Sequence, residues 1–571
     1  MQELSHFQSI ATHMIAADRE RDHMLRAMDA MWHNRWQLPP ALHAVGWVHK
    51  VVSTDPHDAV RAGTRVLSSV APRITAQPLG YASGGGEGAG QQAERIERAL
   101  AWHFRNASRR RRASVLRDVV LSALLYDEVV AQVVYLPAQQ DAARQLGLAA
   151  SGPAQGFGPF AIIVRNPQQV HVRYSDWAPE AVLLKQVMPL SEAAAFWGSA
   201  LTEKLPKPRR GRAGRRMPEL NNCTIFDYMD GEYRAVWAVL QEDGAVLAEP
   251  TGSEQVAAIE ILREPHGLDF LPWAAKVGGT TLHSDGGQRI PLLASVFQSG
   301  QWDTQNIVET LLASEVIAYA AAPRLKVEGP TAEVDVDYGE PGRVVHVPPG
   351  HQLNPLAAPG LDESLARIAE RVSERMGKST VPRVLQSADF PGGTAFATLN
   401  LATQSGIKSL TPYKELAEDA LAEVFQLMLS WVQHSGQPLD AYVSKRGRSE
   451  TVRLDPAEGD LTEVLIDVEL TADVPTDRMA RINAASMAVR DLGYSRERAL
   501  EQIGETDAKE VMQQAEQEQL AAARLEARKR QLIAGASPEP QASTQGFDPA
   551  AGGLPPVIAN PDAVAGANTA E

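Results

Sequence analysis

The stretch that decides the fold opens with SVFQSGQWDTQNIVETLLASEVIAYA at Ser295–Ala320, continues with LDESLARIAERVSERM from Leu361, and reaches DFPGGT at Asp389–Thr394. Apolar residues recur at helical spacing in the first two segments, which predicts helices over Ser295–Ala320 and Leu361–Lys378. The residues between them, Ala321–Gly360, are rich in Pro, Gly and Val, so we expect an excursion of short strands there. Two helices that carry a small β unit between them are typical of a structural wall, and no catalytic signature interrupts them.

A third helical pattern follows the glycines. Its apolar face runs from Tyr413 to Val432 and has Pro412 at its base. Because proline breaks a preceding helix, we expect a separate helix over Thr394–Gln404 and a break at about Ser405–Gly406.

The first helix combines two stripes. Its apolar residues, such as Ile307 and Leu311, are expected to pack, while Gln305, Asn306 and Glu309 belong to a polar stripe that is expected to face water.

The N-terminal half predicts one α+β domain over residues 51–290, preceded by a helical arm over residues 1–50. Trp32, Trp36 and Trp47 are interpreted as packing residues. Helices are predicted at Asp55–Leu67, Glu94–Asn106 and Ser114–Leu125, and strands at Pro72–Pro78, Val129–Leu136, Ala161–Arg165, Val170–Tyr174, Ala181–Lys185, Thr224–Met229, Tyr233–Leu240 and Val256–Leu262. The turn formers between the strands favour antiparallel connections.

The C-terminal part returns to helices after one strand. Apolar and acidic residues alternate over Val464–Leu470, which predicts a half-buried strand. The surrounding acidic segment lacks the spacing of an EF-hand, so we expect no metal. Helices are predicted at Arg478–Asp491, Ser495–Ile503 and Asp507–Ile533, and the composition of Ala534–Glu571 predicts a disordered tail.

Composition restricts the class of protein. The chain has 571 residues and a formal net charge of −15, which does not indicate a protein that wraps DNA. Two basic clusters, residues 109–112 and 204–216, are interpreted as solvated loops. The single cysteine, Cys223, fits a reducing compartment, and neither a signal peptide nor a membrane span is expected.

Enzyme signatures are missing from the sequence. There is no phosphate-binding P-loop, no H-E-x-x-H, no G-x-S-x-G and no kinase set, and the 14 histidines show no metal-ligand spacing. No cofactor and no catalytic residue are therefore predicted. Two alternatives remain open: a multidomain hydrolase whose residues, such as Asp303 or Asp389, meet only in the fold, and a helical scaffold or adaptor.

The order of elements resembles the portal proteins of tailed double-stranded DNA bacteriophages, which form the ring at the head-to-tail vertex. The resemblance spans most of residues 50–530 and rests on element order and a few similar segments, such as LRDVVLSALLYDEVVAQVV at Leu116–Val134. It implies a helix-rich α+β fold whose parts are a wing (51–290), a first stem helix (291–320), a clip (321–360), a second stem helix (361–378), a tunnel loop with a long helix and a return to the wing (379–475), a helical crown (476–533) and the tail (534–571).

The resemblance also implies a function. Copies of the chain would form a ring, of twelve subunits in the family, through which the genome is packaged and ejected. Its partners would be a terminase motor, head-completion or adaptor proteins, and the major capsid and scaffold proteins, with double-stranded DNA passing non-specifically and no membrane contact. The protein would assemble in the host cytoplasm and reside in the virion.

The resemblance places candidate functional residues in two segments. The tunnel loop nearest to DNA would consist of Gln386, Ser387, Asp389, Phe390, Pro391, Gly392, Gly393 and Thr394, with the two glycines supplying flexibility. In the clip, Arg324, Lys326 and Arg343 would contact the terminase or an adaptor, although ordinary exposed loop charges explain these three residues equally well.

Overall fold

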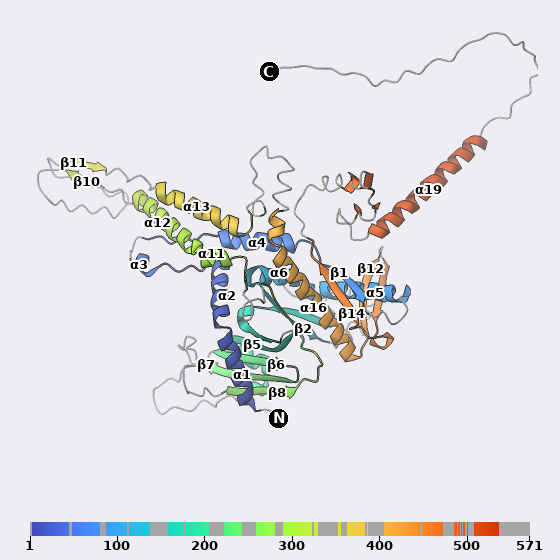
Figure 1. Ribbon diagram of the computed structural model, residues 1–571, viewed down its shortest axis with the longest axis horizontal. Helices are drawn as coiled ribbons and strands as arrows, with labels where there is room; N and C mark the ends of the chain where they lie inside the picture. Colours follow the sequence, from blue (N-terminus) through green and yellow to red (C-terminus); the bar gives the residue numbers. More distant parts are fainter. Residues whose placement is uncertain are drawn as a thin grey trace, which may run out of the picture. The chain divides into compact units, whose positions relative to one another are not determined.

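The computed structural model describes most of the chain in two units, Met1–Val474 and Pro475–Glu571 (Figure 1). The described residues are 3–44, 48–79, 87–110, 113–136, 158–175, 178–204, 222–241, 258–279, 289–321, 325–328, 352–355, 363–382, 385, 405–445, 448–471, ten residues between 485 and 500, and 508–535. Helices and antiparallel sheets are both present, so the α+β prediction is confirmed.

Two buried helices lie at the centre of the first unit. Helix α6 (Val115–Tyr126) begins at Ser114, whose hydroxyl accepts a hydrogen bond from the Arg117 amide. Helix α16 (Thr411–Ser435) has proline in its first turn and ends at Gly436, which has φ +62°. Apolar residues of α16 are buried against α6 and against the adjacent strands, so the apolar face predicted from Tyr413 to Val432 is a core face.

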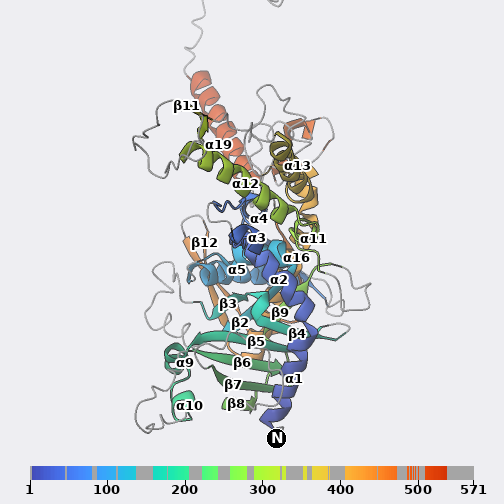
Figure 2. The same cartoon turned by 90° about the vertical axis from the view of Figure 1, so that its left-hand side faces the viewer.

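Three N-terminal helices pack around this centre. Helix α2 (Arg19–Trp32) and helix α4 (Asp55–Leu67) pack against α6, and helix α5 (Glu87–Arg110) packs against the sheets beside it. Helix α1 (Leu4–Ala17) instead covers the five-stranded sheet through Phe7 and crosses its strands (Figure 2). A short helix, α3 (Pro40–His43), follows the prolines that were predicted to end the helical arm.

The strands form antiparallel sheets in the described part of the chain. A three-stranded sheet has the order β3-β2-β9 and a five-stranded sheet has the order β4-β5-β6-β7-β8. The strand bounds are β2 Glu128–Tyr135, β3 Phe160–Arg165, β4 Val170–Tyr174, β5 Pro179–Pro189, β6 Asn222–Asp230, β7 Tyr233–Gln241, β8 Ala258–Pro265 and β9 Trp273–Val277. Two short helices, α9 (Leu190–Trp197) and α10 (Ser199–Thr202), lie against the second sheet.

The strand predicted over Val464–Leu470 belongs to the first unit. It is β14 (Val464–Glu469), which alternates buried and exposed residues and pairs antiparallel with β1 (Arg73–Pro78). A hairpin of β12 (Leu439–Lys445) and β13 (Arg448–Leu454) precedes it. Every second side chain of β14 is buried, and the strand packs against α16. This burial explains why the chain adds a strand to the first unit before the C-terminal helices.

The helix predicted over Ser295–Ala320 is two helices. Helix α11 (Ala294–Gln298) ends at Ser299, Gly300 has φ +64°, and α12 (Gln301–Ala321) follows. The apolar spacing continues through this break, and only the glycine signals it. Short strands β10 (Leu325–Glu328) and β11 (Gln352–Pro355) pair antiparallel, and α13 (Glu363–Ser379) completes the series.

The second unit contains α19 (Ala508–Gly535), which matches the helix predicted from Asp507. The predicted tail begins at Ala534, but Ala534 and Gly535 still belong to α19. The rest of the tail and most of the two helices predicted before α19 lie outside the described residues.

Candidate functional site: a helix pair and its buried anchors

Helices α12 and α13 pack side by side and run in opposite directions. At the end of the pair nearer the body of the first unit, the Ser295 hydroxyl of α11 lies 3.4 Å from the Ser379 carbonyl oxygen of α13. The sheet of β10 and β11 lies at the other end of the pair (Figure 1). The two helices therefore carry the β unit away from the body of the first unit.

An extended segment, residues 48–53, is bound along α12 by side-chain hydrogen bonds. The Ser314 and Thr310 hydroxyl groups accept from the amides of His49 and Val51, at 2.8 and 3.1 Å. Asn306 accepts from the Ser53 amide at 2.7 Å. Four helical residues rise about 6.0 Å and two extended residues about 6.6 Å, so every second amide meets every fourth helical residue.

These contacts correct the expectation for the polar stripe of α12. Gln305 and Asn306 do not face water: they are 3% and 0% exposed. Thr310 and Ser314 are fully buried as well. The reason is that a neighbouring segment with unpaired backbone amides needs polar partners, and the stripe supplies them.

Asp55 joins both helices of the pair at their root. Its Oδ2 accepts hydrogen bonds from Gln305 Nε2 of α12 and from the Ser373 hydroxyl of α13, both at 3.1 Å. Trp302 of α12 donates from Nε1 to the Ser53 carbonyl oxygen at 3.3 Å. The segment that begins α4 thus fixes α12 against α13.

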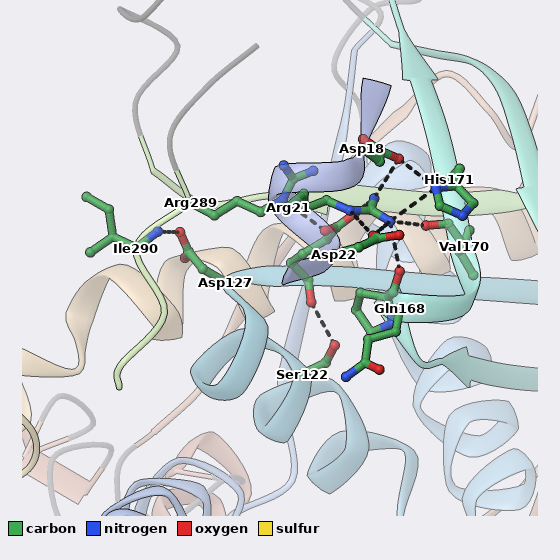
Figure 3. A network of polar contacts seen from close by, with 12 residues as sticks. Asp18, Arg21, Asp22, Ser122, Asp127, Gln168, Val170, His171, Arg289 and Ile290 are labelled. Atoms are coloured by element: carbon green, nitrogen blue, oxygen red, sulfur yellow. Dashed lines mark hydrogen bonds and ion pairs between the residues drawn. The ribbon is translucent and has the colours of Figure 1, made fainter. Parts of the chain in front are cut away.

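A second anchor lies where the chain enters α11. Asp127 ends α6 in the left-handed conformation, and its Oδ2 accepts from the Ile290 amide at 2.8 Å (Figure 3). The Tyr413 hydroxyl donates to the Ile290 carbonyl oxygen at 2.9 Å. Burial raises the pKa of Asp127 to about 6, against the opposing effect of the Ile290 hydrogen bond.

The next residue, Glu128, is fully buried between two arginines. Its Oε2 accepts from Arg289 Nε at 2.9 Å, and its Oε1 lies 3.5 Å from Arg21 Nη1. Arg21 in turn donates to the Val170 carbonyl oxygen at 2.8 Å (Figure 3). This ionic group ties α2, the sheets and the start of the helix series to one point.

The residues expected to contact DNA or partners are not placed by the structure. Gln386, Ser387, Asp389, Phe390, Pro391, Gly392, Gly393 and Thr394 lie outside the described residues, as do Arg324 and Arg343. Lys326 lies in β10, where only the backbone is described. The predicted helix over Thr394–Gln404 is also outside the described part.

The two ends of the segment that contains those loop residues meet. Leu385 is buried, and a Cβ added to Gly406 would lie 2.9 Å from Leu385 Cδ1. Leu385 and Gly406, which lie on either side of residues 386–404, are therefore close neighbours.

The sequence did not indicate the anchors as such. Asp127 and Glu128 appear in it as two adjacent carboxylates within an otherwise apolar stretch, which is a signal of buried pairing. Asn306, Thr310 and Ser314 recur at intervals of four, which signals a polar helix face without revealing its partner.

Within the described residues, no group of three or more His, Cys, Asp or Glu side chains is arranged to hold a metal ion. The same part of the chain contains no helix with the length and apolar character needed to cross a membrane.

The sequence matches no family model and no curated protein. Among solved structures it is similar to the neck of an empty gene transfer agent (GTA) particle computed with C6 symmetry, with 12% identity, a TM-score of 0.40, and coverage of 82% of this chain and 94% of the other. It is also similar to the neck of a native GTA particle computed with C12 symmetry, with 11% identity, a TM-score of 0.38, and coverage of 81% of this chain and 97% of the other. A chain of the native GTA virion has 11% identity and a TM-score of 0.38, with coverage of 82% of this chain and 94% of the other.

Proposed function

We propose that this chain is the subunit of a portal, the ring through which double-stranded DNA enters and leaves a tailed phage-like particle. One observation carries the proposal: the antiparallel pair α12 and α13 is rooted on a body of helices and sheets and holds a two-stranded β unit at its far end. This order corresponds to the wing, first stem helix, clip and second stem helix of the portal proteins that the sequence resembles. The loose likeness to particle necks is compatible with the proposal, which does not depend on it.

The surface of the helix pair favours association with further copies. Val316 and Ile317 of α12 and Ile368 of α13 are 48%, 39% and 41% exposed. Large apolar side chains gathered on two helices are stabilised by a partner surface. Since a pair of different faces on identical copies can close into a cycle, a ring, with twelve copies as in the family, is the assembly proposed here.

The segment 386–404 would act as the tunnel loop. Leu385 and Gly406, which flank this segment, are close neighbours, and this contact would give the loop a fixed base. Residues 386–394 would lie nearest to DNA, and Gly392 and Gly393 would let the loop change shape.

The β10–β11 unit would act as the clip and would dock the packaging motor. Arg324, Lys326 and Arg343 belong to this part of the sequence and could pair with acidic groups of a terminase or of a head-completion protein. Capsid and scaffold proteins would contact the wing, residues 51–290.

Removal of the chain tests the proposed function. Particles assembled without it should contain no DNA, and wild-type protein supplied in trans should restore the DNA content, as measured by nuclease-protected DNA per particle. Normal packaging in its absence would refute the function.

A further inference from the structure

An acidic groove opens at the root of the helix pair. It has a volume of about 440 Å³ and lies between α12, α13 and the start of α4. Three carboxylates, those of Asp55, Glu309 and Glu370, are in its walls, and no lysine or arginine lines it. The remaining lining residues are Val52, Ser53, Thr54, Gln305, Ala369 and Ser373.

The side-chain oxygen of a buried glutamine, Gln305, accepts no hydrogen bond from the described residues. Gln305 is 3% exposed, and its Nε2 donates to Asp55 Oδ2 and, at 2.7 Å, to Glu309 Oε1. Those two carboxylates fix the orientation of the amide, so Oε1 remains an acceptor. No partner for Oε1 exists among the described residues.

The groove therefore offers acceptors and negative charge to a ligand that brings donors and positive charge. The acceptors that a ligand can reach are the carboxylates of Asp55, Glu309 and Glu370, because Gln305 Oε1 has no surface open to the groove. A guanidinium group fits this chemistry because it is always charged and presents five N–H donors in a plane.

A matching basic stripe lies on α13 itself. Arg367, Arg371 and Arg375 are exposed and recur at intervals of four, on one face of the helix. Arg371 and Arg375 form no ion pair within the described part of the chain. Arg371 lies about 200° around the helix from Ser373, a lining residue of the groove, so a copy cannot fill its own groove with this stripe.

We propose that Arg371 and Arg375 of one copy enter the acidic groove of the next copy in the ring. This inference rests on the proposed portal function and names the charged contact between its subunits. The two surfaces are different and face away from each other, which is the arrangement that a head-to-tail cyclic interface requires. Complementary charge fixes the register of the contact, while the exposed apolar residues Val316, Ile317 and Ile368 add buried area.

Charge reversal tests the contact. Arg371→Glu with Arg375→Glu reverses the stripe, and Glu309→Lys with Glu370→Lys reverses the groove. Each double variant alone should lose the oligomer at protein concentrations where the wild type assembles, as measured by analytical ultracentrifugation. Arg61→Glu with Arg65→Glu reverses two exposed arginines at the same spacing on α4 and should leave the oligomer intact.

Two rescue experiments separate a lost contact from a lost fold. Both double variants mixed in equal amounts should form rings, because each reversed surface then meets its reversed partner in an alternating cycle. A single chain that carries all four substitutions should also assemble.

The outcomes distinguish this contact from the portal function. A wild type that never exceeds a dimer would contradict the function itself. Rings that persist in both double variants, or loss of rings without rescue in either the mixture or the four-substitution chain, would overturn the contact and leave the portal function standing.

Discussion

Asp127 holds three segments together at one point. Its backbone amide bonds to the Ala123 carbonyl oxygen at 3.0 Å, and its own carbonyl oxygen accepts from the Gly278 amide at 2.9 Å. Its carboxylate binds the Ile290 amide, from which the chain continues into α11. Helix α6, strand β9 and the start of the helix series thus meet at a single buried acid.

Replacement of this acid by its amide should change how stability depends on pH. The pKa of Asp127 is about 6 in the folded state and about 4 in an unfolded chain, so the folded state binds the proton more tightly. The wild type therefore loses stability as pH rises from about 4 to 6, by up to about 3 kcal/mol. Asp127→Asn keeps a hydrogen-bond acceptor and tolerates the left-handed backbone. Because the amide does not titrate, the variant should not lose this stability between pH 4 and 6.

Denaturant unfolding of both proteins at pH 4 and pH 7 measures the effect. Asp127→Asn should gain stability relative to the wild type at the higher pH. A difference between the two proteins that does not vary with pH would show that this carboxyl group is not held with a raised pKa.

Gly278 is the neighbour that allows Asp127 its position. A Cβ at residue 278 would lie 2.0 Å from Asp127 Oδ1, and the Ile290 hydrogen bond prevents the carboxylate from moving freely. Gly278→Ala should lower the free energy of unfolding by about 1–3 kcal/mol. Gly231→Ala, where a Cβ would meet nothing within 4 Å, is the control and should cost much less. Equal losses in the two variants would argue against the close approach.

At the scale of elements, the hydrogen bonds between residues 48–53 and α12 help to fix the position of the helix pair. Thr310 both accepts from the Val51 amide and donates to the Val51 carbonyl oxygen, at 3.1 and 3.2 Å. Thr310→Val retains the shape of the side chain and leaves two backbone groups unpaired. Local stability should fall by about 1–3 kcal/mol.

Hydrogen exchange measures that loss directly. Amides of residues 48–53 should exchange about tenfold faster for each 1.4 kcal/mol lost. Thr304→Val is the matched control, because among the described residues the exposed Thr304 hydroxyl bonds only to the carbonyl oxygen of the nearby Gly300. Unchanged exchange in Thr310→Val would mean that the segment is held by other contacts.

The proposed tunnel loop, residues 386–394, has a prediction of its own. Gly392→Pro with Gly393→Pro fixes two backbone φ angles at about −65° and should impair DNA packaging without affecting ring assembly. Packaged DNA per particle and the mass of the purified oligomer are the two measurements. Normal packaging by this variant would contradict a moving loop.

The sequence was informative about elements and poor about their partners. Apolar periodicity located α4, α6, α13 and α16 to within a few residues, because each of these helices buries apolar side chains at helical spacing. It missed the β12–β13 hairpin, whose strands carry charged residues and no long apolar run, and it missed β9, a short strand that pairs with the distant β2. The polar stripe of α12 was assigned to water for the same reason: Asn306 and Thr310 bind a segment about 250 residues earlier in the chain, as their hydrogen bonds show.

At the scale of the molecule, the account rests on association. A chain that builds the wall of a channel needs two complementary faces and a rigid base. The base is supplied by Asp55, Asp127 and Glu128, which hold the helix pair to the body of the first unit. The faces are the acidic groove and the arginine stripe. Because the composition of Ala534–Glu571 predicts disorder, its deletion should leave the oligomer unchanged in analytical ultracentrifugation.

The most direct test of the account is an averaged electron-microscopy view of the purified full-length protein down its oligomer axis. The account predicts a closed ring with cyclic symmetry and an open centre wide enough for duplex DNA. Particles that remain monomers or dimers under all assembly conditions, or a closed assembly without a central opening, would contradict it.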